Sequence, residues 1–247
     1  MQIVLAALSL ALLMWVEAAS AQSTYSMSVS RHSSVPSLSE AEVREILASA
    51  SKMLQDDPGS PNDVKCDVTF VLEGPIRTFR DLPKMRRPNT LASVDKKNIA
   101  AVNKVDSDVH GVDFHVKVVE EIKFCRPGVH GNQAGCAFSP PDFRSIIVVH
   151  PQRHRDPRNP DGPRLASFPD HLLWAHEFGH LTGLGHREGV GNRNDEIALM
   201  TRCNLSAQFS GLPDTRVQVS ADECRHLLAG PGRRSPGPFQ SQPVCRQ

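Results

Sequence analysis

The sequence has little net charge and few aromatic residues, and both shortages exclude classes of function. The net charge of +1 gives no strong field that would attract nucleic acid or an anionic membrane. Aromatic residues make up 5% of the chain, which is too few for a platform on which bases could stack. The 39% apolar and 22% charged residues, over 247 positions, indicate an ordinary globular protein with a sizeable core and no nucleic-acid partner.

Long hydrophobic runs are also absent, except at the N-terminus. Residues 3–16 are almost all apolar, but this run is too short to span a bilayer comfortably. The small-x-small pattern "ASA" at 19–21 follows it and predicts a signal peptide over residues 1–21, cleaved after Ala21. An uncleaved anchor is the alternative. After cleavage, we expect a secreted or periplasmic protein with no membrane partner.

The six cysteines include no Cys-x2-Cys pair, which argues against a cysteine-based zinc site. An even number of cysteines in an exported chain instead predicts a set of disulfides. Local spacing and then elimination favour these pairs: Cys125 with Cys136, Cys203 with Cys224, and Cys66 with Cys245.

Local patterns predict an α+β protein in which strands precede a central helix. Residues 22–37 are rich in serine and are predicted to be a flexible leader. Ser39 and Glu42 predict a capping box at the start of a helix over 39–55. The predicted strands are 66–72, 114–125 and 144–151. Further helices are predicted at 94–104, from 170 to the glycines at 183 and 185, and after Ser220, with irregular chain between the last two.

The stretch "HEFGHLTGLGH" places three histidines and a glutamate at spacings that suit a metal site. On a helix, His176 and His180 lie one turn apart and point the same way. Glu177 lies about 100° further round, so its carboxylate can reach a water on the metal. Gly183 can adopt a left-handed conformation that ends the helix and lets His186 return to the metal. Three neutral imidazoles with one open position suit catalytic Zn²⁺, which is the expected cofactor.

The same helix has an apolar stripe opposite the histidines, formed by Trp174, Phe178 and Leu181. A helix buried on one side and lining a metal site on the other belongs at the floor of a cleft. A histidine-rich helix end without a metal is the alternative interpretation. The full five-residue pattern is much less expected by chance than His-Glu-x-x-His alone, so the metal site is favoured.

This segment resembles the metzincin zinc peptidases, and "HEFGH" with "GLGH" is most similar to the matrixin branch. The resemblance covers about residues 170–202, where "EIALMTR" is similar to the family's methionine turn and gives that structural role to Met200. It implies that Glu177 is the catalytic general base. The zinc ligands would be His176, His180 and His186.

The resemblance also implies a two-lobed catalytic domain over residues 38–247. The upper lobe, 38–184, would hold a twisted, mostly parallel sheet and the active-site helix. That helix would lie above an irregular lower lobe, 185–247. The predicted order of strands and helices is compatible with this α+β architecture.

Three departures indicate a separate, bacterial-type group rather than a matrixin. Arg187 follows the third histidine, where matrixins usually have serine. Arg202 stands where some branches have a tyrosine ligand. No cysteine precedes Cys66, so a cysteine switch like that of the matrixins is absent from this sequence.

We therefore predict a monomeric, secreted zinc endopeptidase that acts on a protein or peptide substrate. A zinc amidase acting on cell-wall peptide and a catalytically degenerate binding protein are the alternatives, and the intact Glu177 disfavours the second. A second metal site near the active helix is considered and disfavoured against a solvated loop; its candidates are His150, His154, Asp156, Asp161 and His171. The acidic segment 106–113 lacks calcium-loop spacing and is predicted to be a polar turn.

Overall fold

A computed structural model describes eight stretches of the chain. They are residues 22–56, 63–82, 93–125, 133–138, 144–150, 170–187, 196–200 and 216–232. The predicted signal peptide, Arg202 and most candidates for the second metal site lie outside them. No helix within these stretches is both long and apolar enough to cross a membrane.

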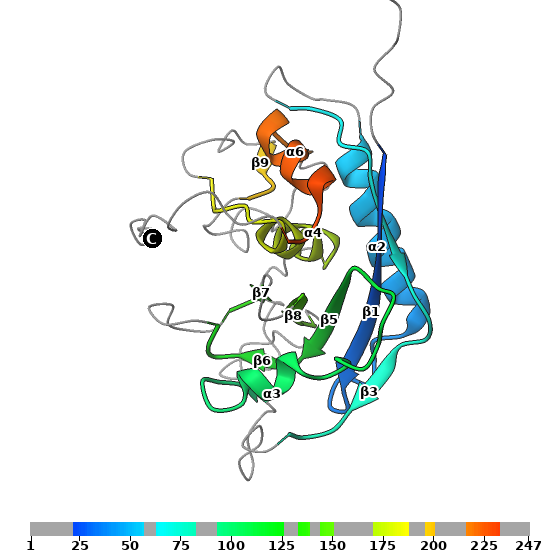
Figure 1. Ribbon diagram of the computed structural model, residues 1–247, viewed down its shortest axis with the longest axis vertical. Helices are drawn as coiled ribbons and strands as arrows, with labels where there is room; N and C mark the ends of the chain where they lie inside the picture. Colours follow the sequence, from blue (N-terminus) through cyan, green and yellow to red (C-terminus); the bar gives the residue numbers. More distant parts are fainter. Residues whose placement is uncertain are drawn as a thin grey trace, which may run out of the picture.

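A mostly parallel sheet forms the centre of the structure (Figure 1). Its strand order is β2-β1-β5-β8-β7, and β3 also pairs with β1. These strands are β1 Ser23–His32, β2 Val68–Leu72, β3 Arg77–Phe79, β5 Phe114–Val119, β7 Gly135–Phe138 and β8 Ser145–Val149. All of the pairings are parallel except that between β7 and β8. The predicted α+β class with a mostly parallel sheet is confirmed.

The prediction of a flexible leader over residues 22–37 was wrong, because β1 lies inside the sheet between β2 and β5. Its apolar residues Tyr25, Met27 and Val29 are buried and alternate with serines, which is the period of a strand. Ser30 is buried as well, and its hydroxyl donates a hydrogen bond to the Asp106 carboxylate. The high serine content concealed a strand whose serines have polar partners on the second face of the sheet.

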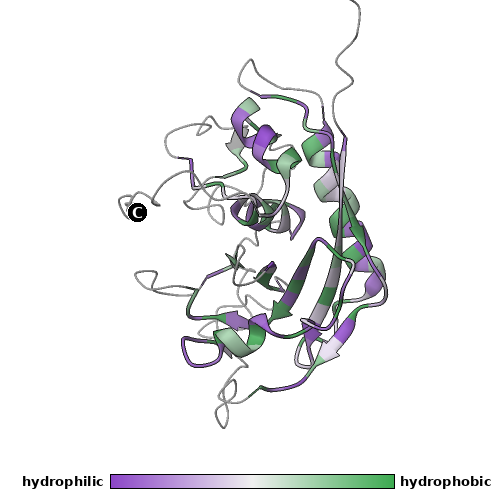
Figure 2. Cartoon of the chain, viewed as in Figure 1, coloured by the Kyte–Doolittle hydropathy of each residue, from purple (hydrophilic) through white to green (hydrophobic). Residues whose placement is uncertain are grey.

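Hydrophobic side chains cover both faces of the sheet. On one face, the two long helices α2 Glu40–Gln55 and α4 Asp170–Leu181 share a core with Val116 of β5 and Ile146 of β8. On the other face, α3 Ile99–Asn103 and the short strands β4 Ser93–Val94 and β6 Glu121–Ile122 share a smaller core with Val119 and Ile147. Figure 2 shows hydrophobic residues interrupted by hydrophilic ones along β5, and further hydrophobic residues along α2. Burial on both faces explains the nearly continuous apolar run of β8, whereas β5 also carries the polar His115 and Lys117.

The helix starts agree with the sequence. Ser39 and Glu42 form the predicted capping box of α2. The helix predicted after Ser220 is α6 Ala221–Ala229, and Ser220 and Glu223 form a capping box there too. The apolar residues along one side of α2 are buried, except for the partly buried Met53. Local side-chain to backbone hydrogen bonds explain this agreement, since they need no distant partner.

The helix predicted over 94–104 is confined to Ile99–Asn103, and two other predicted segments differ from the structure. The strand predicted over 114–125 ends at Val119, and the chain turns at Glu120 because Glu121–Ile122 pairs with β4 in a separate sheet. The segment after the histidines was predicted to be irregular, but it contains β9 Glu196–Ala198 and β10 Arg216–Gln218, which pair in parallel. Both differences come from pairing with strands distant in sequence.

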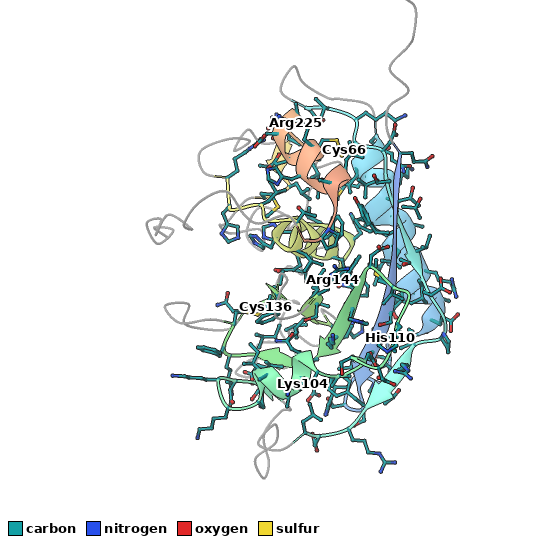
Figure 3. The ribbon with its side chains drawn as sticks, viewed as in Figure 1. Cys66, Lys104, His110, Cys136, Arg144 and Arg225 are labelled. Atoms are coloured by element: carbon teal, nitrogen blue, oxygen red, sulfur yellow. A yellow bond between two sulfur atoms is a disulfide. The ribbon has the colours of Figure 1, made fainter. Side chains whose placement is uncertain are left out.

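The disulfides agree with one predicted pair and correct the other two. Cys125 is joined to Cys136, as their spacing predicts. Cys66 is joined to Cys224 rather than to Cys245, so the predicted Cys203–Cys224 pair was wrong too. Figure 3 shows Cys66 at the end of the molecule where Arg225 of α6 lies. Cys203 and Cys245 lie outside the described residues. The Cys66–Cys224 bridge spans 158 positions, and tertiary packing decides it rather than spacing.

Candidate metal centre

Helix α4 lies between the sheet and α6 (Figure 1) and contacts β7, β8 and α6. The predicted back stripe of Trp174, Phe178 and Leu181 is buried in the larger core. Phe178 lies at the centre of an aromatic cluster, with ring centroids about 5 Å from those of Tyr25, Phe70 and Phe114. This packing fixes the rotation of α4 about its axis and therefore the direction of its histidines.

The helix ends at the glycine that the sequence indicated. Gly183 has a φ of 94°, the left-handed region that a side chain disfavours. The amide of Leu184 donates to the carbonyl of Gly179 at 3.0 Å, and that of Gly183 to His180 at 3.0 Å. These bonds close the helix end and reverse the chain toward His186.

The turn brings three imidazoles together. The ligand nitrogens of His176, His180 and His186 all lie within 4.8 Å of one another. The Nε2 atoms of His180 and His186 are 3.0 Å apart. This group could hold a metal ion, as the spacing predicts.

Hydrogen bonds orient the rings for metal binding. Nδ1 of His176 lies 2.7 Å from the carbonyl oxygen of Leu199, and Nδ1 of His180 lies 2.8 Å from that of Leu184. A carbonyl oxygen can only accept, so each Nδ1 donates and each Nε2 bears the lone pair that a metal requires. Burial lowers the pKa of His176 to about 4, against the effect of the Leu199 carbonyl, so its ring is neutral near pH 7. The donor set therefore fits a divalent cation such as zinc.

Glu177 lies next to the first histidine and is 5% exposed. Burial raises the pKa of its carboxyl to about 8. Its Oε2 is buried and has no hydrogen-bond donor among the described residues. A carboxyl whose pKa lies near neutral pH can both take up and release a proton.

Gly135 of β7 is a site residue that sequence reasoning missed. A Cβ at this position would overlap the Glu177 carboxylate and come within 2.6 Å of its Cγ. The backbone of this edge strand therefore lies directly against the glutamate. Its sequence signal was one glycine before Cys136, inside a segment interpreted as a disulfide-bridged loop, and nothing local linked it to the motif.

Met200 is buried beside the same helix, in the turn that follows β9. A Cβ on Gly179 would overlap the Met200 sulfur and come within 3.2 Å of its methyl group. The carbonyl of Met200 accepts from the Arg187 amide at 2.7 Å, and that of Leu199 is the one bonded to His176. The turn thus contacts the metal-binding segment from two sides.

Arg187, the residue that departs from the matrixin pattern, pairs with Glu223 of α6. Its guanidinium donates to Glu223 Oε2 at 3.0 Å and to Gln218 Oε1 at 2.5 Å. Glu223 is 4% exposed and also accepts from the Ser220 amide in the capping box of α6. The residue after His186 is therefore held to α6 by a largely buried ion pair.

The structure also describes the predicted polar turn and two of the residues considered for a second metal site. The segment 106–113 contains the predicted polar turn, in which the Asp106 carboxylate accepts from Ser30 and Arg77. Of the residues considered for a second metal site, His150 and His171 are described. His150 lies near two carboxylates that the sequence did not associate with it.

Comparisons with known proteins do not establish a function for this chain. No protein-family model matches the sequence, and no curated protein matches it. The chain is similar to metalloproteinase-II from Bacteroides fragilis, with 15% identity and a TM-score of 0.45 over 85% of this chain and 53% of that one. It is also similar to a chain from a chaperone–substrate complex, with 14% identity and a TM-score of 0.45 over 85% and 34%. The chain spans about half and about a third of these two proteins.

Proposed function

We propose that this protein is an exported, zinc-dependent endopeptidase of metzincin type. The observation that carries the proposal is the group of three imidazoles beside a buried glutamate, with two Nδ1 atoms bonded to backbone carbonyls. His176, His180 and His186 would hold the ion. When bound, zinc supplies Lewis acidity that polarises a carbonyl and activates water.

Glu177 is the group that moves the proton. Its carboxylate accepts a proton from the attacking water and then delivers it to the leaving amine. The burial that raises its pKa to about 8 favours uptake of that proton, and the nearby backbone of Gly135 restricts where the carboxylate can swing. Hydrolysis of an amide needs a base for the attacking water and an acid for the leaving amine, and Glu177 can serve as both in turn.

The edge strand beside Glu177 supports an extended peptide as the substrate. β7 is the last strand of the sheet order, and Gly135 of β7 touches the glutamate side chain. A peptide added alongside β7 would pair through its backbone and bring a peptide bond close to Glu177. Recognition through the backbone suits cleavage within a protein chain.

Export is supported by the disulfides. Cys66–Cys224 and Cys125–Cys136 are bonds of the kind that persist in oxidising compartments. Together with the predicted signal peptide, they favour secretion or transfer to the periplasm.

The test is Glu177→Gln, which keeps the size of the side chain and removes its acid–base chemistry. We expect the variant to keep its zinc while cleavage of a peptide library falls by about 10²- to 10⁴-fold. Glu45→Gln, on the exposed side of α2, is the matched control and should cleave like the wild type. Unchanged turnover in a zinc-loaded Glu177→Gln protein would falsify the proposal.

A further inference from the structure

A second group of possible metal ligands lies at the opposite end of α4 from the three histidines. Glu42 comes from the first turn of α2, His150 directly follows β8, and Asp170 is the first residue of α4. One ligand atom from each lies within 4.8 Å of the other two. The ligand atoms of both groups lie within 4.8 Å of one another, but the two groups have different donor sets.

The parallel sheet explains why these residues meet. His150 lies at the carboxyl end of β8, and its amide donates to the carbonyl of Val119 at the same end of β5. Helix α2 begins shortly after β1 ends, so its first turn lies at this edge too. Helices α2 and α4 pack against each other, which brings Asp170 beside Glu42. Three separate elements therefore converge at one sheet edge.

The charges at this edge call for a cation. Asp170 and Glu42 each place a carboxylate oxygen within 4.8 Å of the other, so two like charges lie close together at this edge. Oδ1 of Asp170 is buried, and the described residues offer it no hydrogen-bond donor. His150 is 2% exposed, so its imidazole faces protein rather than water. A divalent ion would neutralise both carboxylates and give the buried oxygen a partner.

A hydrogen-bonded trio that shares protons is the competing interpretation of the same residues. It accounts for the short mutual distances but gives no donor to Asp170 Oδ1. A cation accounts for both observations, because an ion can be bound by one oxygen of each carboxylate and by an imidazole nitrogen at once.

We propose that Glu42, His150 and Asp170 form a second divalent-cation site, suited to zinc, that fastens the beginning of α4 to α2 and to the sheet. With two carboxylates, one imidazole and a 2+ ion, the bound site is electrically neutral, which suits its burial. It is structural, since it lies at the helix end away from Glu177 and the three histidines. The proposal does not depend on peptidase activity.

Metal counting on the intact protein tests the site. After zinc loading and removal of excess metal, native mass spectrometry should show two ions per wild-type chain. Asp170→Asn keeps the shape of the side chain and should leave one ion, as should His180→Ala, while the two changes together should leave none. Glu42→Gln should reproduce the loss seen with Asp170→Asn, and Glu45→Gln, on the same helix, should retain both ions.

A thermal measurement separates this site from the histidine site. In a His180→Ala/His186→Ala background, added zinc should raise the melting temperature, and adding Asp170→Asn should abolish that rise. One ion per wild-type chain that is lost with His180→Ala overturns the second site. Two ions that survive both Asp170→Asn and Glu42→Gln overturn it as well. Because Glu177→Gln probes peptidase activity without removing a ligand, failure of the proposed function is recognised separately.

Discussion

The two ends of helix α4 bring possible metal ligands together in different ways. At its C-terminal end, all three histidines come from eleven consecutive positions, His176 to His186. At its N-terminal end, Glu42, His150 and Asp170 come from three elements and meet only in the folded chain. The first group is three imidazoles, and the second is two carboxylates with one imidazole. A helix and one turn are enough to build the first, whereas a whole sheet edge is needed for the second.

Loss of a histidine should have the largest effect and should act at one end only. His180→Ala removes an imidazole whose Nδ1 is held by the Leu184 carbonyl. We expect peptide cleavage to fall to background and one zinc ion to be lost, as measured by a cleavage assay with metal analysis. His110→Ala, at an exposed position, is the control and should change neither quantity. Retention of cleavage in His180→Ala would show that the C-terminal end is not the reactive one.

The contact between β7 and Glu177 should matter next. In Gly135→Ala the new methyl group must displace the Glu177 carboxylate. We expect kcat to fall by about 10²-fold, as for a misplaced catalytic group, with the zinc content unchanged. Gly185→Ala serves as the control, because a Cβ there has no heavy atom within 4 Å. Equal kcat values for the two variants would argue against a role for the edge strand.

The ion pair after the third histidine should affect stability more than chemistry. Arg187→Met leaves Glu223 buried without its guanidinium, which should lower the free energy of unfolding by about 3 kcal/mol. Adding Glu223→Gln removes the stranded charge and keeps a side chain able to cap α6, so part of that loss should return. Urea titration of the single and double variants measures both changes. Additive losses would mean that the pair is not coupled.

The smallest effect concerns how the stability of the metal-free protein depends on pH. The contributions from the two ends of α4, at Asp170 and His176, should change with pH in opposite directions. The folded-state pKa of Asp170 is raised to about 7, so the folded state holds this proton where the unfolded state has lost it. Its stabilising contribution is therefore full below about pH 4 and is lost as the pH rises through 7. His176 has the opposite effect on stability, because its folded-state pKa is lowered to about 4. Between about pH 4 and pH 6.5 only the unfolded state binds this proton, so stability rises with pH over that range.

The measurement is the melting temperature in chelator from pH 4 to 8 for wild type and Asp170→Asn. The wild-type value minus the variant value should decrease with rising pH. A flat difference would mean that Asp170 is not protonated near neutrality in the folded protein. Zinc addition at pH 7 should stabilise the wild type more than the variant.

Features that rest on neighbours in sequence could be predicted. The capping boxes at Ser39 and Ser220 need one turn of helix each, and Gly183 ends α4 because its own φ is positive. The strand β1 was missed because serines fill one of its faces, and their partners, such as Asp106, lie far along the chain. Gly135 was missed for the same reason, since only the pairing of β7 with β8 brings it to Glu177.

The sequence by itself determined the histidine group, because helix periodicity and one glycine fix the positions of three side chains within eleven residues. It also determined the burial of Trp174, Phe178 and Leu181 behind that group. Tertiary structure alone decided the Cys66–Cys224 bridge, the pairing of Arg187 with Glu223 and the convergence of Glu42, His150 and Asp170. The physical reason is that local contacts follow from backbone geometry, whereas these contacts depend on how a parallel sheet places the ends of its strands and helices.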